Sequence, residues 1–367
     1  MTDAVQNPLF SVITAVHNGH RTIGETISTL IAQTQPSWEQ IIIDNGSTDG
    51  TEEVVAAQED LRIRYQYEPE RGRSRARNKG IQLARGKFLL FLDADDWLLP
   101  NALSDHIRFF DRHPRYGVSV SDGHFCTDSG KEIVSFSERR GKVSAGNVLP
   151  RLVIDSGLIG APVCVAVRRE VVRRHAVSFH EDLYIGEDWL FWIEVAALTE
   201  FGFLESKTCK YRWHADNTTL GAGERRRGQQ LAMVRQKAAS APYFKSLPDD
   251  VRREFFYQLL MDALKDIPEE QEKVIVSDPF ANLSPPVKAA LIRIMACARL
   301  AAGDSSDSVR RLLRLSHSAG PSDWKTLVVS SLLAIHPKLA QLAVRGRKSL
   351  HKNVGDPLLA MPSTRLP

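Results

Sequence analysis

Residues 88 to 96 read Phe88-Leu89-Leu90-Phe91-Leu92-Asp93-Ala94-Asp95-Asp96, an apolar run that leads directly into three carboxylates. Such a run of large hydrophobic residues is typical of a strand buried on both faces. The acids then follow the carboxyl end of the strand, which is where open α/β sheets bind their ligands. Carboxylates this close repel one another unless a cation or donating hydroxyl groups lie between them. The alternative is an acidic turn in which Asp96 caps a following helix.

Composition indicates an ordinary globular protein. The 367 residues are 43% hydrophobic and 25% charged, and the length suffices for two or three domains. The cysteines form no Cys-x-x-Cys pair, so neither a zinc site nor a disulfide framework is expected. They are Cys126, Cys164, Cys209 and Cys297. Residues 1 to 10 lack a basic segment followed by an apolar one, and no window approaches eighteen apolar residues, so we expect a cytoplasmic protein.

The charge differs between the two parts of the chain. From residue 220 onward there are 23 Lys and Arg against 14 Asp and Glu, whereas the preceding part has 25 against 30. A basic carboxyl-terminal part and an acidic amino-terminal part indicate different partners.

Strand and helix patterns alternate along the first hundred residues. The expected strands are 9–16, 38–43, 62–67 and 88–92, and the expected helices are 22–33, 51–59 and 74–84. Ser47 or Thr48 is expected to cap the second helix. This order predicts a parallel sheet with right-handed crossovers. No Gly-x-Gly-x-x-Gly follows the first strand, which disfavours a dinucleotide-binding domain.

The rest of the chain is predicted to change from mixed to helical. Further strands are expected at 117–125, 132–136 and 162–167. From about Gly223 the pattern is helical, without strands. Polar residues follow three of the first four strands, namely His17 and Asn18, then Asp44, then Asp93 and Asp95. Because the carboxyl ends of parallel strands share one edge, these side chains are expected to line one cleft.

An ordered set of motifs resembles the inverting family 2 glycosyltransferases, which have the GT-A fold. The matching segments are Ser11 to Asn18, Gln33 to Glu39, Ile41 to Thr51, Arg75 to Gly80, Phe91 to Asp96 and Gly186 to Trp189. The resemblance covers roughly residues 8 to 220. It implies a GT-A catalytic domain over 1–220, an α/β fold with a mostly parallel sheet, and leaves 221–367 as a helical region.

The resemblance also implies a nucleotide diphosphate-sugar donor, with UDP-sugars favoured. Asp44 would accept a hydrogen bond from the base, and Ala15 and His17 would line the base pocket. Asp93 would hold the ribose or, through water, a metal ion. Asp95 would bind Mn²⁺ or Mg²⁺ directly, because hard oxygen ligands suit these ions. His214 lies where related enzymes often carry a histidine near the metal.

A basic run precedes the acidic strand, with Arg71, Arg73, Arg75, Arg77 and Lys79 at every second position. On a helix, Arg73 and Arg77 would share one stripe and the other three another. The resemblance implies that Arg77 reaches toward the nucleotide, and at least three of the five are expected on a solvated face. Aromatic residues are not interleaved, so nucleic acid is not an expected partner.

Inversion requires a base that deprotonates the acceptor hydroxyl. The resemblance implies Asp188 as this base, with Glu187 as the neighbour that orients it. Glu181 and Asp182 form a competing pair. We favour the later pair because the aromatic helix that begins at Trp189 would supply a rigid mount and a sugar-stacking platform.

The end of the chain is apolar over 326–335 and 339–344 and then basic, with Arg345, Arg347, Lys348, His351 and Lys352. The apolar run is too short to span a bilayer. A membrane-contacting tail and a helix that packs on the catalytic domain or in a homodimer both fit this pattern.

The sequence therefore predicts a metal-dependent inverting glycosyltransferase. A saccharide or lipid-linked acceptor in surface polysaccharide or glycolipid synthesis is expected. A sugar-nucleotide nucleotidyltransferase and a catalytically silent nucleotide-sugar-binding module are the alternatives.

Overall fold

The computed structural model describes residues 7–141, 143–214, 217, 223–320, 324–335, 338, 340, 341 and 344. The chain divides into two compact units, Met1–Ala238 and Ala239–Pro367. The boundary expected at residue 220 precedes this division, so most of helix α11 (Glu224–Ser240) belongs to the first unit.

The first unit begins with alternating strands and helices. They are β1 (Phe10–Val16), α2 (Ile23–Ile31), β2 (Trp38–Asp44), α3 (Thr51–Ala56), β3 (Ile63–Tyr67), α4 (Arg73–Leu83) and β4 (Phe88–Phe91). This order agrees with the prediction. The next elements are β5 (Trp97–Leu98), α5 (Ala102–Arg112), β6 (Val118–Cys126), β7 (Glu132–Ser135), α6 (Phe136–Arg140) and α7 (Leu149–Leu152). They are followed by η1 (Pro162–Cys164), β8 (Val165–Arg168), α8 (Arg169–Arg174), α9 (Glu187–Ala196) and β9 (Phe201–Arg212).

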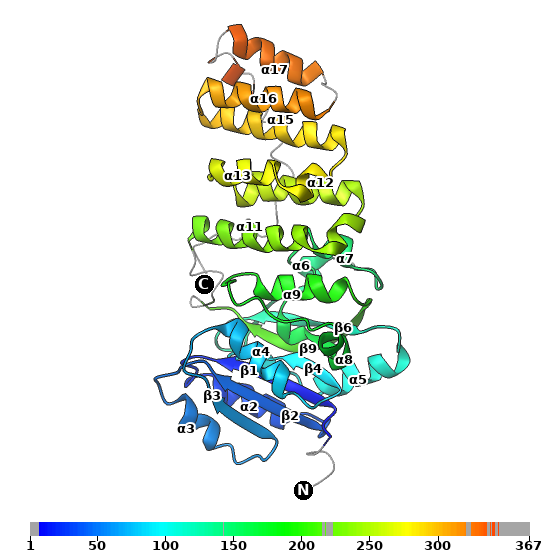
Figure 1. Ribbon diagram of the computed structural model, residues 1–367. Helices are drawn as coiled ribbons and strands as arrows, with labels where there is room; N and C mark the ends of the chain where they lie inside the picture. The colour runs from blue at the N-terminus through cyan, green and yellow to red at the C-terminus, as the bar shows by residue number, and fades with distance from the viewer. Residues whose placement is uncertain are drawn as a thin grey trace. The chain divides into compact units, whose positions relative to one another are not determined.

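The strands form one sheet in the order β3-β2-β1-β4-β8-β6-β9-β5, and β7 pairs with β6 (Figure 1). Strands β3, β2, β1 and β4 are parallel neighbours. β8 then runs antiparallel to both β4 and β6, whereas β6 and β9 are parallel. The carboxyl ends of β1, β2 and β4 therefore lie at the same edge, as the sequence predicted.

Helices cover both faces of the parallel half of the sheet. Helix α4 packs against β1 so closely that a Cβ added at Gly80 would stand 2.3 Å from Ile13 Cγ2. On the opposite face, residues of α2 and α3 join a buried cluster with Val16 and Ile42. Because side chains alternate along a strand, successive residues of β1 serve the two faces in turn. Burial on both faces explains why β1, β2 and β4 are rich in large apolar residues.

One local prediction and one alternative were wrong, and one strand was missed. Asp96 caps no helix, because the chain continues into β5, which pairs antiparallel with β9. Gly50, not Ser47 or Thr48, is the N-cap of α3, and no side-chain cap bond is made there. Strand β9 was not predicted, because its residues vary irregularly between buried and exposed instead of alternating.

The second unit is helical, as predicted, and no strand occurs in its described part. Its elements are η2 (Pro242–Ser246), α12 (Asp249–Gln258), the π-helical η3 (Leu259–Ala263), α13 (Pro268–Ile275), α14 (Asp278–Ala281), α15 (Pro285–Ala302), α16 (Ser306–Ala319) and α17 (Trp324–Ile335). Phe244, Phe255, Phe256 and Phe280 pack on one another in its core. Among the described helices, none has the length and apolar character needed to cross a bilayer. The basic residues Arg345, Arg347, Lys348, His351 and Lys352 lie outside the described part of the chain.

Candidate active site

Asp44 is held rigidly at the end of β2. Its carboxylate accepts a hydrogen bond from the Ser47 backbone N–H at 2.7 Å and another from the Tyr65 hydroxyl at 2.7 Å. Burial and the neighbouring Asp44 carboxylate raise the pKa of Tyr65, so the phenol stays protonated as a donor. Tyr65 was not identified from the sequence, because its only signal is its alternate position on β3.

Ala15 and His17 flank Val16, the residue that is paired with Asp44 in the sheet register. His17 is exposed, and its Nδ1 lies 3.0 Å from the Asn45 carbonyl oxygen. Ala15 is half-buried. The two residues expected at a base pocket are thus accessible, and the contact to Asn45 fixes the imidazole orientation.

Arg77 joins two carboxylates from distant parts of the chain. Its guanidinium donates to Asp93 Oδ1 at 2.7 Å and to Glu187 Oε1 at 3.0 Å. Arg73, one helical turn earlier on α4, donates to the same Glu187 oxygen at 2.8 Å. Arg77 is 2% exposed. Its contacts therefore differ from the expected reach toward a nucleotide, because its guanidinium is engaged by the protein's own acids.

The stripe expected for the basic run is present in part. Arg73 and Arg77 share a face of α4, as their spacing predicted, and both contact Glu187, which it did not. Arg71 lies before the helix and is exposed, and Arg75 pairs with the exposed acids Glu70 and Glu181.

Electrostatic interactions keep the side chains of Arg77 and Asp93 charged. Burial alone would raise the pKa of Asp93, but the positive charges of Arg77 and Arg73 outweigh it and lower that pKa. Burial likewise opposes the charge of Arg77, and Asp93, Glu187 and Asp188 reverse the effect and raise its pKa. Asp188 therefore lies within the electrostatic reach of the guanidinium that binds Asp93.

Asp188 lies in the first turn of α9, next to Glu187. Gly186, the N-cap, has a φ of 78°, a left-handed conformation that a side chain rarely adopts. This turn places two acids at the helix N-terminus, where the peptide dipoles favour negative charge. Burial and the adjacent Glu187 nevertheless raise the pKa of Asp188. A carboxylate with a raised pKa is a stronger base than an ordinary aspartate.

The aromatic helix supplies a mount but no stacking platform, so that part of the prediction was wrong. Trp189, Phe191 and Trp192 are 5%, 0% and 2% exposed and belong to the core. Trp189 Nε1 donates to the Leu152 carbonyl at 2.7 Å, which fixes the helix start. The competing acids Glu181 and Asp182 are exposed, and Asp182 pairs with Lys237 at 2.8 Å.

Asp95 and His214 form a contact pair beyond β4. His214 Nε2 lies 2.8 Å from Asp95 Oδ2, and their side chains are 19% and 29% exposed. Among the described residues, no group of three or more His, Cys, Asp or Glu side chains is gathered as a metal site. Asp93, expected with them, instead has one oxygen on Arg77. Asp95 and His214 thus offer one oxygen-bearing and one nitrogen-bearing group toward solvent.

Arg212 holds residues 93–96, the acidic loop, in place and was not identified from the sequence. Its backbone N–H donates to Asp96 at 2.9 Å, and its guanidinium donates to the Asp95 carbonyl at 2.8 Å. Burial, followed by Asp95 and Asp93, raises the pKa of Asp96 well above its usual range. The pKa of Tyr211 is raised by burial and by the four acids Asp96, Asp93, Asp95 and Asp188. The phenol of Tyr211 therefore interacts electrostatically with acids of both the acidic loop and α9.

The chain is similar in sequence and in fold to known proteins. Residues 11–174 match the model of Glycosyl transferase family 2. An uncharacterised glycosyltransferase of Rickettsia conorii is 31% identical over 211 residues, which make up 57% of this chain and 34% of that protein. The matched region thus spans about a third of that relative's length.

Two solved structures share the fold. TarS residues 1–349 of S. aureus, in complex with UDP-GlcNAc, aligns with a TM-score of 0.57 and 17% identity over 92% of both chains. The mannosyltransferase PcManGT of Pyrobaculum calidifontis, in complex with GDP-Man and Mn²⁺, gives 0.50 and 19% over 93% of this chain and 88% of that one.

Residues 11–174 of the first unit are thus similar to a family 2 glycosyltransferase domain, and the solved structures share the GT-A fold. The expected family and fold class are thereby confirmed. The matched segment contains Asp44, Arg77, Asp93 and Asp95, whereas Asp188 and His214 lie beyond its end.

Proposed function

We propose that the protein transfers a sugar, with inversion, from a nucleotide diphosphate-sugar to a hydroxyl of a saccharide or lipid-linked acceptor. The observation that carries this proposal is the double contact of Arg77 with Asp93 and Glu187. It brings the acids after β4 and the acids of α9 into one site, as a donor and an acceptor that react together require.

In this proposal Asp44 recognises the base of the donor. Its carboxylate accepts a donated N–H in the plane fixed by Ser47 and Tyr65, and the exposed imidazole of His17 stacks on the ring. The nucleotide-sugars bound by TarS and PcManGT support a donor of this class. We favour a UDP-sugar.

Asp188 acts as the general base. It takes the proton of the acceptor hydroxyl as that oxygen attacks the sugar carbon, on the face opposite the departing diphosphate. Glu187, held by Arg73 and Arg77, fixes the first turn of α9 and raises the basicity of its neighbour.

The chemistry of the donor set fits Mn²⁺ or Mg²⁺. Asp95 and His214 would hold the ion, with Asp93 nearby in the same loop, because carboxylate oxygen and imidazole nitrogen suit Mn²⁺. When bound, the ion would neutralise charge on the leaving diphosphate.

Turnover of a nucleotide-sugar panel with Mn²⁺ tests the reaction. Release of a nucleoside diphosphate supports the proposal, release of pyrophosphate supports a nucleotidyltransferase, and no release of either supports a silent binding module. Thermal-shift screening of UDP-, GDP-, dTDP- and CDP-sugars identifies the donor class, and metal-dependent stabilisation by one class should disappear in Asp95→Ala.

The base is tested by comparing two aspartates of the same region. Asp188→Asn should lower kcat by about 10²-fold or more, because general-base catalysis typically contributes that much. Asp182→Asn, on the exposed competing pair, should stay within about twofold of the parent enzyme. Equal losses in both variants would remove Asp188 from its assigned role.

A further inference from the structure

A basic pocket lies at the opposite end of β4 from the acidic loop. The cavity has a volume of about 400 Å³ and is lined by Lys87, Arg168, Arg169, Glu170, Arg173 and Arg174. Lys87 immediately precedes β4, and Arg168 ends β8, whose register pairs it with Phe88 at the start of β4. Asp93 follows Lys87 by six positions of extended chain, so the pocket lies about 20 Å from the proposed active site.

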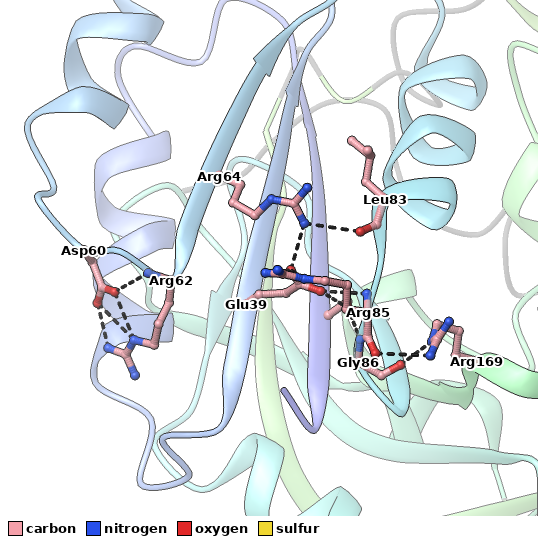
Figure 2. Close-up of polar contacts among 9 residues, drawn as sticks. Glu39, Asp60, Arg62, Arg64, Leu83, Arg85, Gly86 and Arg169 are labelled. Carbon is pink, nitrogen blue, oxygen red and sulfur yellow. Dashed lines mark hydrogen bonds and ion pairs between the residues drawn. The ribbon is translucent and has the colours of Figure 1, made fainter. Parts of the chain in front are cut away.

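Two of the arginines are fixed by backbone carbonyl groups. Arg168 Nε donates to the Tyr116 carbonyl at 3.0 Å. Arg169 Nε donates to the Gly86 carbonyl, and its Nη2 donates to the Arg85 carbonyl at 3.2 Å (Figure 2). A carbonyl oxygen satisfies an N–H donor but carries no formal charge, so both guanidinium groups keep their full positive charge.

The turn that receives Arg169 is itself anchored. Glu39, whose side chain is 2% exposed, accepts from the Arg85 backbone N–H at 2.8 Å and from its guanidinium at 2.8 Å (Figure 2). The Ser11 hydroxyl donates to Glu39 at 2.7 Å and accepts from the Gly86 N–H at 2.8 Å. The wall of the pocket is therefore rigid before any ligand arrives.

The pocket's positive charge is not balanced by the protein. Lys87, Arg173 and Arg174 are exposed, and within the described residues no ion pair joins any of the pocket's five basic side chains to an acid. Elsewhere in the same unit, Arg62 pairs with Asp60 and Arg151 with Asp155. Gathering like charges in one concavity costs free energy that a bound anion recovers.

We propose that this pocket binds a phosphate-bearing anion, the phosphate monoester or diphosphate group of a small molecule or lipid. Guanidinium forks match phosphate oxygens, and Arg168 and Arg169 are already oriented. A ratio of five basic residues to one acidic residue favours a multiply charged group over a single carboxylate. The volume is within the range of small-ligand sites.

Calorimetry with inorganic pyrophosphate, on the full chain without divalent metal at physiological salt, tests this. The parent protein should show saturable binding, weakened at least about tenfold in the double variant Arg173→Glu/Arg174→Glu. The matched control is Lys131→Glu/Lys207→Glu, which reverses two exposed charges that do not line the pocket, and it should bind within about twofold of the parent. Asp95→Asn should also bind normally, which separates this pocket from the proposed active site.

Flotation with vesicles of neutral lipid, with and without an anionic phospholipid, identifies the source of the phosphate. Binding to anionic vesicles that is lost in Arg173→Glu/Arg174→Glu assigns a lipid phosphate. Binding of pyrophosphate without vesicle binding assigns a soluble phosphate compound. If the parent protein binds neither, or if the double variant binds as the parent does, the pocket is only a solvated basic surface and the proposal is overturned.

Discussion

Replacing Arg77 with methionine tests whether the site is held together as described. Methionine keeps much of the apolar length of arginine, so the change removes mainly the charge and its hydrogen bonds. Glu187 is 3% exposed and would then retain only Arg73, whose side chain is 37% exposed. Asp93, at 26% exposed, would lose the same partner.

The expected cost is large because a buried carboxylate is left poorly compensated. Breaking a buried ion pair by removing one partner typically costs about 3–5 kcal/mol. In a unit of this size each kcal/mol lowers Tm by about 2–4 °C, so Arg77→Met should lower Tm by roughly 6–20 °C. Arg73→Met removes a half-exposed partner of the same oxygen and should cost only about 0–1 kcal/mol.

Thermal melting of the full chain at pH 7.5, followed by circular dichroism, measures the difference. The double variant Arg77→Met/Glu187→Gln should recover part of the loss, because the stranded charge is then removed. A Tm loss in Arg77→Met no greater than that in Arg73→Met would refute the view that Arg77 joins the two halves of the site. So would a double variant that is less stable by the full sum of the two single effects.

Three further changes have defined outcomes. Gly80→Ala should cost about 1–3 kcal/mol, because its Cβ would stand 2.3 Å from a β1 side chain, whereas Gly157→Ala, with its nearest contact at 3.4 Å, should melt near the parent temperature. Folding raises the pKa of Asp188, so the parent protein should lose stability relative to Asp188→Asn as pH rises from the pKa of the unfolded state through that of the folded state. The Tm of the variant should therefore gain on that of the parent between pH 4 and pH 8. A relative Tm that moves in favour of the parent over this range contradicts the raised pKa. Tyr65→Phe removes one hydrogen bond to Asp44, worth about 1 kcal/mol, and should weaken binding of the nucleotide-sugar about fivefold in titration calorimetry. An unchanged affinity would contradict the role given to Tyr65.

The parallel half of the sheet could be predicted because its signals are local. Strands β1, β2 and β4 are short, buried runs rich in apolar residues, and β3 alternates apolar and polar residues, so each is indicated by its own residues. Strand β9 lacks that signal because its stability comes from pairing with β6 and β5, which are distant in sequence. The short strand β5 depends on β9 in the same way, which is why the sequence left a helix cap at Asp96 as an alternative.

The candidate site could be predicted at the level of residue types but not of partners. Motif positions indicated Arg77, Asp93 and Glu187, yet nothing in their spacing showed that the arginine is inserted between the two acids. That contact exists because α4 and the first turn of α9 approach the same strand end, which only the fold determines. A basic residue beside a nucleotide-binding motif suggests a phosphate contact from its charge alone, which is why Arg77 was expected to reach the nucleotide. In this chain Glu187 and Asp93 hold Arg77, and without it the buried Glu187 carboxylate would be poorly compensated. The arginines of the basic pocket, which form no ion pair with an acid in the described part of the chain, lie at the other end of β4.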